Sequence, residues 1–230
     1  MNFDFLNNIN FGLIIIQAPA ILMALTIHEY FHGWTANKLG DRTAELNGRL
    51  TLNPIAHLDV LGTILMFVVG FGWAKPVPIN PMNFKDPKKG TLLVAIAGPL
   101  SNLATAVVAG LILSFMIPRM ITGELVFQGA YVVIPVFIIL SFVYGIALAI
   151  FNLLPIPPLD GSRVLYAVLP DKQLRVYSQF ERYGVLVLFG LFIFADGIFR
   201  YIFLPASLLS EFLSGYSFSQ LWGIIGQLIG

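Results

Sequence analysis

Long apolar segments dominate this sequence and decide which class of protein it can form. Several approach the roughly 20 residues that a helix needs to cross a bilayer core, and they cover residues 11–39, 91–117, 129–154 and 184–199. Hydrophobic residues make up 57% of the chain and charged residues only 11%, whereas about a quarter of the residues of an average soluble domain are charged. The chain is therefore predicted to be an integral membrane protein.

Two further apolar stretches do not predict a single membrane-spanning helix. Residues 205–230 are interrupted by Glu211 and by SGYSFSQ, so they fit either a crossing or an amphipathic helix on the membrane surface. Residues 60–83 begin with an apolar part that is too short for a comfortable crossing and contains several glycines, and a proline-rich part follows. We expect residues 60–83 to enter the membrane and return to the same face.

The polar stretch ELNGRLTLN, residues 45–53, places Asn47 and Gly48 between two short alternating runs. Asn-Gly is the strongest short signal for a β-hairpin turn. No fixed-period repeat and no long polar linker interrupts the chain, which predicts one membrane domain over residues 1–230, with its core at about 10–168 and C-terminal helices at about 182–230. The predicted fold is an all-α polytopic membrane protein with about five or six membrane segments and a small re-entrant β-hairpin or sheet.

Basic residues are distributed unevenly between the two predicted faces. If the N-terminus lies outside, one face collects Lys38, Arg42, Arg49, Lys85, Lys88, Lys89, Arg163, Lys172, Arg175 and Arg182. Lysine and arginine are enriched in cytoplasmic loops, so the sequence predicts a multi-pass protein of the cell membrane with its N-terminus outside. The first residues, MNFDFLNNIN, lack the basic region and cleavage site of a signal peptide, and no cleaved leader is expected.

Charge and cysteine content exclude several kinds of partner and site. The formal net charge is +1, which gives no reason to expect nucleic acid as a partner. The chain has no cysteine, so disulfides, thiolate metal sites and cysteine nucleophiles are excluded. A metal ion in this protein has to be held by histidine, aspartate or glutamate.

The stretch TIHEYFHGW, at the end of the first apolar segment, carries the strongest chemical signal. On a helix, His28 and His32 are four residues apart and face the same way, so both imidazoles can reach one ion. Glu29 lies beside them as a base for a water molecule on that ion, which is the HExxH arrangement of zinc peptidases. The structural alternative is that these are ordinary polar residues at the interfacial end of a helix, although such groups are costly inside a bilayer.

A catalytic zinc ion needs a third protein ligand and an open position for water. Two residues are candidates: His57 in LTLNPIAHLD, and Asp160 in FNLLPIPPLDG. Asp160 follows an apolar segment broken by prolines, close to hydrocarbon depth, where coordination to a metal would offset the cost of its charge. The alternative for Asp160 is a helix N-cap, because aspartate is favoured there.

The sequence resembles the site-2 protease family of intramembrane zinc metalloproteases. The motifs HEYFH, LTLNPIAHLD, FGWAKPVPINP, AGPLSN and FNLLPIPPLDG follow one another here in that family's order, over residues 26–163. The resemblance is to a short prokaryotic member without PDZ or CBS modules, and it departs at Ser162, where many relatives have a second glycine. It implies that one Zn2+ per chain is bound by His28, His32 and Asp160, and that Glu29 is the catalytic base.

Further residues are candidates for the transition state or the substrate. Asn152 and His57 are candidate donors to the oxyanion, although each also fits a structural role as a helix cap or an interfacial residue. Asn102 in AGPLSN is a buried amide that could bond a substrate backbone or a neighbouring loop, and Lys75 lies in the re-entrant stretch. The extended part of that stretch could pair with a substrate strand by β-augmentation, or it could only plug the cavity.

The predicted activity is hydrolysis of peptide bonds in or near transmembrane segments of membrane-protein substrates, in a cavity reached from the cytoplasmic side because His28 lies near the basic end of its helix. The role that the family resemblance implies is regulated intramembrane proteolysis or clearance of signal-peptide remnants. Two other classes are considered: a transporter or metal carrier that uses the His, Glu and Asp cluster, and a binder of membrane segments that does not cut. The sequence identifies neither the substrate nor the oligomeric state.

Overall fold

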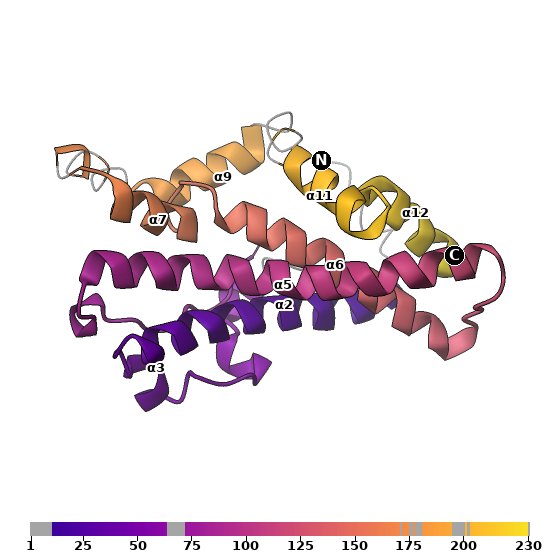
Figure 1. The fold of residues 1–230 in the computed structure, drawn as a ribbon, viewed down its shortest axis with the longest axis horizontal. Coiled ribbons are helices and arrows are strands. Elements are labelled where there is room, and N and C mark those ends of the chain that lie inside the picture. The colour runs from indigo at the N-terminus through magenta and orange to yellow at the C-terminus, as the bar shows by residue number, and fades with distance from the viewer. Residues whose placement is uncertain are drawn as a thin grey trace.

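Three long helices form the body of the molecule. The structure is a computed structural model that describes residues 11–63, 72–170, 172–174, 177, 181–194, 201 and 203–229. Helices α2 (Phe11–Lys38), α5 (Pro87–Ile121) and α6 (Val133–Asn152) pack against one another, and α2 and α5 run along the long axis (Figure 1). All three are long and apolar enough to cross a bilayer. The chain is therefore a membrane protein, as predicted.

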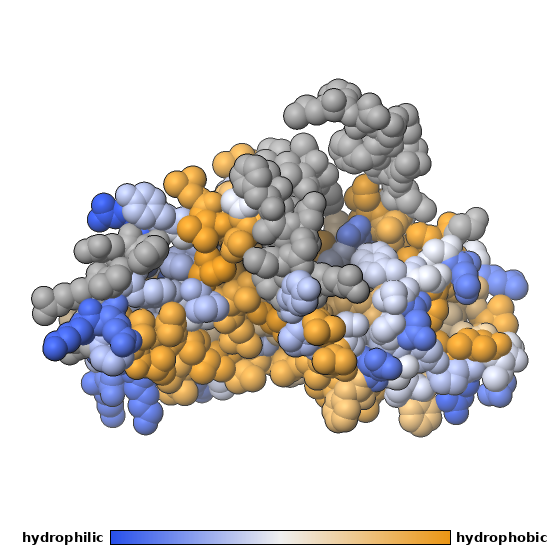
Figure 2. Space-filling view, turned by 90° about the horizontal axis from the view of Figure 1, so that it is seen from above, coloured by the Kyte–Doolittle hydropathy of each residue, from blue (hydrophilic) through white to orange (hydrophobic). Residues whose placement is uncertain are grey.

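The core lies mainly where α5 meets α6. Glycines let the two helices approach closely, as small residues do in membrane proteins. A Cβ at Gly110 would come within 2.7 Å of the Phe142 ring, and one at Gly145 within 2.9 Å of the Asn102 backbone oxygen. In the space-filling view, hydrophobic side chains gather over the middle of the molecule and hydrophilic ones toward its two ends (Figure 2). This distribution suits a bilayer core flanked by water on both sides.

The predicted count of about five or six membrane segments is not supported. Apart from the four-residue α3 (Thr43–Leu46), the remaining helices whose bounds lie in the described chain are also short: α7 (Asp160–Val168), α9 (Gly184–Phe194), α11 (Leu204–Ser214) and α12 (Phe218–Ile229). The longest of these, α12, has 12 residues and a length of about 18 Å, well below the thickness of a bilayer core. The apolar stretch 205–230 is divided at Gly215, whose left-handed φ of 80° ends α11. Residues 195–199 of another predicted segment lie outside the described residues.

The predicted β-hairpin is wrong, and the Asn47-Gly48 pair explains why. Residues Thr43–Leu46 form the short helix α3. Gly48 has φ 65° and donates its N–H to the oxygen of Glu45, while the N–H of Arg49 bonds to the oxygen of Ala44. This is the Schellman pattern that ends a helix. A hairpin turn and a Schellman stop both need a left-handed residue, so Asn-Gly serves either one.

The described chain contains no β-sheet around the site. The structure has one isolated antiparallel bridge, between Leu58 and Ala74, and residues 75–80 are extended without a strand partner. Short 3-10 turns, η1 (Pro54–His57) and η2 (Pro81–Asn83), flank this region, and a third, η3 (Gly129–Val132), precedes α6. The middle of the predicted re-entrant stretch, residues 64–71, lies outside the described residues.

Asp41 fixes the chain where it leaves α2. Its carboxylate is fully buried and accepts hydrogen bonds from the backbone N–H of Asn80 at 2.7 Å and from Nδ2 of Asn83 at 2.7 Å. Both the backbone N–H and the hydroxyl of Thr43 donate to it as well. One side chain therefore ties the end of α2 to the far end of the extended segment.

We expect Asp41→Asn to destabilise the protein by about 2 kcal/mol, because hydrogen bonds to a charged group are lost or left poorly paired. Burial would raise the pKa of Asp41, but its hydrogen bonds from Thr43, Asn80 and Asn83 outweigh burial and lower that pKa. A lowered folded-state pKa contributes stability that is fully present above the unfolded pKa of about 3.9 and is lost as pH falls below it. The difference in Tm between Asp41→Asn and the parent protein should therefore be largest near neutral pH and shrink below about pH 4.

Thermal unfolding in detergent, followed across this pH range, tests the expectation. Glu45→Gln is the matched control, because Glu45 is a carboxylate of the same region that pairs with the exposed Arg42 at 2.7 Å. Exposed ion pairs contribute little, so its Tm should stay close to that of the parent. Equal Tm values for Asp41→Asn and Glu45→Gln would contradict the role assigned to Asp41.

Candidate metal centre

Three side chains from two distant parts of the chain converge between the long helices. Nε2 of His28 lies 2.9 Å from Oδ2 of Asp160, and Nε2 of His32 lies 3.2 Å from the same oxygen. The two Nε2 atoms are 3.0 Å apart. Both imidazoles are buried, at 5% and 6% exposure. These three residues are those that the sequence analysis proposed as ligands.

The local structure explains how each ligand reaches the site. His28 and His32 lie one turn apart on α2 and so share a face. Asp160 is the first residue of α7; the helix cap is Leu159, and no side chain caps this end. A Cβ at Gly161 would come within 2.2 Å of the Leu153 oxygen, so the glycine lets α7 begin directly against the end of α6. The carboxylate of Asp160 turns to the histidines instead of capping its helix.

One stripe of α5 supports both histidines. Val94, Gly98 and Asn102 are spaced by four residues and face α2. The backbone oxygen of Val94 lies 2.7 Å from Nδ1 of His32, and the Asn102 amide lies 3.1 Å from Nδ1 of His28. Between these contacts, a Cβ at Gly98 would come within 2.4 Å of the His32 ring. The absence of a side chain at position 98 makes room for the imidazoles.

The contact with Val94 sets the tautomer of His32, and the tautomer of His28 follows from the orientation of the Asn102 amide. The Val94 oxygen can only accept, so Nδ1 of His32 carries the proton and Nε2 keeps its lone pair. Oδ1 of Asn102 is buried and has no partner within the described chain. A half-turn of this amide lets Oδ1 accept from Nδ1–H of His28, since the two ends of an amide are interchangeable in shape. Both Nε2 atoms then face Asp160 as acceptors.

The ligand atoms of His28, His32 and Asp160 all lie within 4.8 Å of one another. Two imidazole lone pairs and a carboxylate that face one another within about 3 Å repel unless a cation lies between them. Ligand atoms about 2.0 Å from a tetrahedral ion are themselves about 3.3 Å apart, close to the separations found here.

Glu29 lies at the edge of this cluster and has a separate contact. Its Oε2 accepts a hydrogen bond of 2.8 Å from the backbone N–H of Val77. Oε1 accepts no hydrogen bond within the described part of the chain. Glu29 is not among the residues whose ligand atoms lie within 4.8 Å of one another. It is therefore placed as a neighbour of the cluster with one oxygen still available.

Comparison with known proteins identifies the family. Residues 16–195 match Peptidase family M50. The chain belongs to this family. It is similar to "Putative zinc metalloprotease YwhC" of Bacillus subtilis (strain 168), with 41% identity over 173 residues, which cover 75% of this chain and 78% of that protein. It is also similar to "Putative zinc metalloprotease Rip2" of Mycolicibacterium smegmatis, with 30% identity over 188 residues, 79% of this chain and 68% of that protein.

A third relative comes from an archaeon. "Putative zinc metalloprotease MJ0611" of Methanocaldococcus jannaschii is 31% identical over 159 residues, 68% of this chain and 73% of that protein. No solved structure matches the chain. The M50 family is the site-2 protease family, so the predicted resemblance is confirmed, and the protein is a zinc metalloprotease with zinc as its cofactor.

His28, His32 and Asp160 are suited to hold the zinc ion of an M50 peptidase. Two imidazole nitrogens and one carboxylate oxygen are a ligand set of catalytic zinc sites, which keep a further position open. The contacts of His32 with Val94 and of His28 with Asn102 are the outer hydrogen bonds that orient histidine ligands. Asn102, proposed from sequence as a contact of substrate or loop, instead contacts a candidate ligand.

The other residues proposed from sequence make ordinary structural contacts here. Nδ2 of Asn152 donates to the Leu148 oxygen at 3.0 Å, within its own helix. His57 is buried, its Nε2 lies 2.8 Å from the Thr51 oxygen, and its Nδ1 has no partner within the described chain. Lys75 is exposed and bonds through its backbone. No hydrogen bond of the described chain joins Asn152, His57 or Lys75 to the metal cluster, and their catalytic roles stay predictions.

Sequence reasoning missed three residues of the site. Gly98 was treated as one of several small packing residues, Arg49 only as a positive charge, and Val77 was not singled out. Val77 had a local signal, since it is flanked by Pro76 and Pro78 and carries the one N–H of that tripeptide. Gly98 and Arg49 act on residues distant in sequence and leave no such local pattern.

Proposed function

We propose that the protein is an intramembrane zinc endopeptidase that hydrolyses peptide bonds in or near transmembrane segments of membrane-protein substrates. The observation that carries the proposal is the convergence of His28, His32 and Asp160, with Glu29 beside them, between helices apolar enough to cross a bilayer. Catalysis inside a bilayer needs a cavity with protein walls, because charged groups and free backbone cannot face lipid. The whole of residues 1–230 acts as one membrane domain in this proposal.

The residues have distinct roles in the proposed reaction. His28, His32 and Asp160 hold one zinc ion, which supplies Lewis acidity and lowers the pKa of a coordinated water. Glu29 accepts a proton from the attacking water at Oε1 and passes it to the leaving amine. Asn152 and His57 are the proposed donors to the oxyanion, and Asn152 would have to exchange its bond to Leu148 for this role.

A substrate must be unwound before its backbone can reach the site, and the extended segment 75–80 is the proposed place for it to pair. In this segment the N–H groups of Lys75, Val77 and Asn80 are already donated within the protein. The backbone oxygens of Val77 and Pro78 accept no hydrogen bond within the described chain. Together with the N–H and the oxygen of Ile79, which also have no hydrogen bond within the described chain, these acceptors are what the segment offers to an incoming strand.

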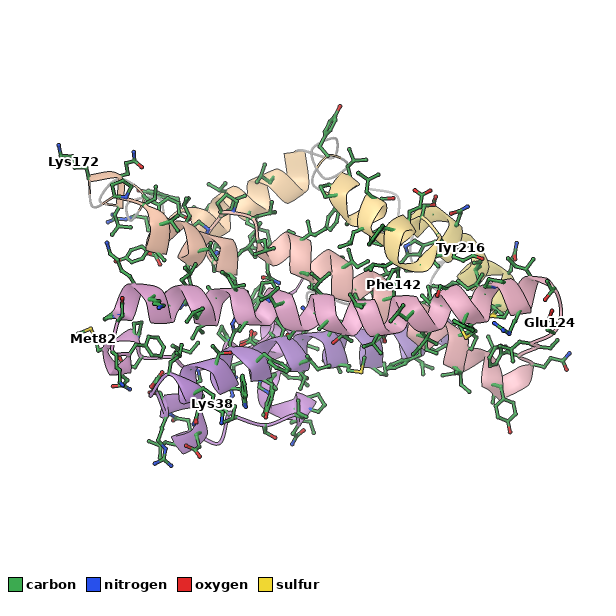
Figure 3. The ribbon with its side chains drawn as sticks, in the orientation of Figure 1. Lys38, Met82, Glu124, Phe142, Lys172 and Tyr216 are labelled. Atoms are coloured by element: carbon green, nitrogen blue, oxygen red, sulfur yellow. The ribbon has the colours of Figure 1, made fainter. Side chains whose placement is uncertain are left out.

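We propose that the site is reached from the cytoplasmic face of the cell membrane and that the N-terminus lies outside. Lys38 and Lys172 lie toward one end of the molecule and Glu124 toward the other (Figure 3). This agrees with the positive-inside rule applied to the sequence. The biological role proposed from the family is processing of a membrane-tethered regulator or clearance of signal-peptide remnants.

Glu29→Gln is the variant that tests the proposed function. Glutamine keeps the size and polarity of the side chain but cannot take up a proton, so kcat should fall about 10²–10⁴-fold, while zinc per chain should stay at the parent value. The measurement is cleavage of a panel of single-span model proteins, co-reconstituted with the enzyme in lipid vesicles, read by gel and mass spectrometry. Glu124→Gln is the control, because Glu124 is an exposed carboxylate in the turn that follows α5.

The outcomes separate the alternatives. Cleavage that disappears in Glu29→Gln, with zinc retained, supports the peptidase. A metal carrier should keep its zinc transport in this variant, and a binder should keep its capture of membrane segments. Cleavage at an unchanged rate in Glu29→Gln would contradict the proposed mechanism.

A further inference from the structure

The contact between Glu29 and Val77 joins the HExxH helix to a segment 48 residues further along the chain. Val77 stands between Pro76 and Pro78, which have no backbone N–H. No neighbouring amide of the tripeptide can replace its hydrogen bond to Oε2 of Glu29. Val77 is also buried, and its side chain packs against α2: a Cβ at Gly33 would come within 3.2 Å of its Cγ1. The segment thus lies directly on the helix that carries the cluster.

Arg49 holds this segment from the other side. Its Nη2 donates to the backbone oxygens of Lys75 at 2.8 Å and of Pro76 at 3.2 Å, the two residues before Val77. Nε of Arg49 is buried and has no partner within the described chain, so the two carbonyl contacts account for the hydrogen bonds of this guanidinium. The N–H of Lys75 is donated to the oxygen of His57 at 2.9 Å.

The segment is therefore fixed on both sides of the donor. Arg49 and the His57 oxygen hold it before Val77, and Asp41 holds the N–H of Asn80 after it at 2.7 Å. A donor fixed in this way restricts rotation of the carboxylate that it bonds, because turning the carboxylate would break the hydrogen bond. Restricting one oxygen also determines where the other oxygen lies.

We propose that the backbone N–H of Val77 is a positioning group for Glu29, and that Arg49 is the positioning residue that holds this N–H in place. The hydrogen bond at Oε2 leaves Oε1 directed to the reacting water. The inference rests on the proposed role of Glu29 as the base, and it adds a role for two residues outside the HExxH and LDG motifs. Arg49 acts only through the segment and contacts neither substrate nor metal.

Hydrogen exchange of the Val77 amide tests the structural part without any substrate. A proteolytic fragment that begins at Lys75 and ends before Ile79 reports on Val77 almost alone, because prolines contribute no exchangeable amide and a fragment's first amide loses its label. In detergent-solubilised parent protein the Val77 amide should be protected. We expect its exchange to accelerate by at least about tenfold in Glu29→Ala and in Arg49→Ala. Unchanged exchange in either variant would overturn the inference.

Kinetics test the catalytic part. Val77→Pro removes the N–H yet keeps an extended backbone, which the following Pro78 already favours. Val77→Ala keeps the N–H and reports the effect of trimming the side chain. We expect kcat of Val77→Pro to be about 10–100-fold below that of Val77→Ala, the loss typical of a hydrogen bond to a charged group, with similar KM and equal zinc per chain. Equal kcat values for these two variants would refute the positioning role.

Arginine variants complete the test with the model protein that the parent enzyme cleaves. Arg49→Ala should lower kcat about 10-fold or more without loss of zinc, and added methylguanidinium should restore part of the rate. Arg42→Ala is the matched control, because Arg42 is an exposed guanidinium of the same region that pairs with Glu45, and its rate should equal that of the parent.

The failures of the two proposals differ. If Glu29→Gln still cleaved the substrate, the proposed peptidase function itself would be refuted. If Glu29→Gln were inactive and Arg49→Ala fully active, the peptidase mechanism would be supported. Only the positioning role of Arg49 would then be refuted.

Discussion

Gly98→Ala is expected to weaken zinc binding strongly, although position 98 supplies no ligand. A Cβ there would lie 2.4 Å from Nε2 of His32 and 2.7 Å from Cε1 of His28, closer than any real carbon contact. The imidazoles cannot simply move aside, because His32 is bonded to Val94 and His28 to Asn102. Displacing the ligand rings and breaking their outer hydrogen bonds should lower the affinity for zinc by at least about 10–100-fold. Zinc per chain, measured by plasma mass spectrometry on purified protein, should fall well below that of the parent.

Gly110→Ala is the matched control for this prediction. Gly110 is a buried glycine of the same helix, where a Cβ would come within 2.7 Å of Phe142 and 3.2 Å of Leu213. Its alanine variant should lose stability by about 1–3 kcal/mol through overpacking and still bind zinc. If both variants keep full zinc, the close approach of α5 to the histidines is not needed for the site. If both lose it, the effect of Gly98→Ala is one of folding and not of the metal centre.

Much of the site could be predicted because its strongest signals are local. His28 and His32 need only the period of a helix to meet, and the apolar run around them forms α2 with nearly the predicted bounds. Asp160 is not local to them, and the sequence left His57 as an alternative. The geometry brings Asp160 to the histidines, while His57 lies outside the cluster. The broken end of α6 and the glycine at 161 are what put the aspartate there.

The predictions that were wrong or incomplete have equally definite physical causes. Apolar content reports that a segment prefers lipid, but it does not report where a helix ends, so the sequence marked SGYSFSQ as an interruption of residues 205–230 without deciding between a crossing and a surface helix, and the structure ends α11 there, at Gly215. Asn47-Gly48 fixes a left-handed residue and leaves open whether a strand or a helix precedes it. The contacts of Val77 and Arg49 run through backbone atoms, which are the same at every position and therefore carry no sequence signal.

Asp160→Ala is expected to leave the protein folded and without zinc. The variant removes one of three ligands and the negative charge that pairs with the metal, so occupancy should drop from about one zinc per chain to nearly none. Proteolysis should fall to background with it. The structural alternative for this residue is a helix cap, and the geometry argues against it, because the N-terminus of α7 has no side-chain cap and the carboxylate contacts both histidines.

Asp86→Ala distinguishes loss of a cap from loss of a ligand. Asp86 is also an aspartate at the start of a helix, but it caps α5, accepting a hydrogen bond from the N–H of Lys89 at 3.0 Å. Its alanine variant should lose about 1 kcal/mol of stability and keep its zinc, whereas Asp160→Ala should lose zinc out of proportion to any change in Tm. Equal zinc in Asp160→Ala, Asp86→Ala and the parent would mean that the two histidines hold the metal with some other third ligand. His57, whose Nδ1 is buried without a partner in the described chain, would then be the first residue to replace.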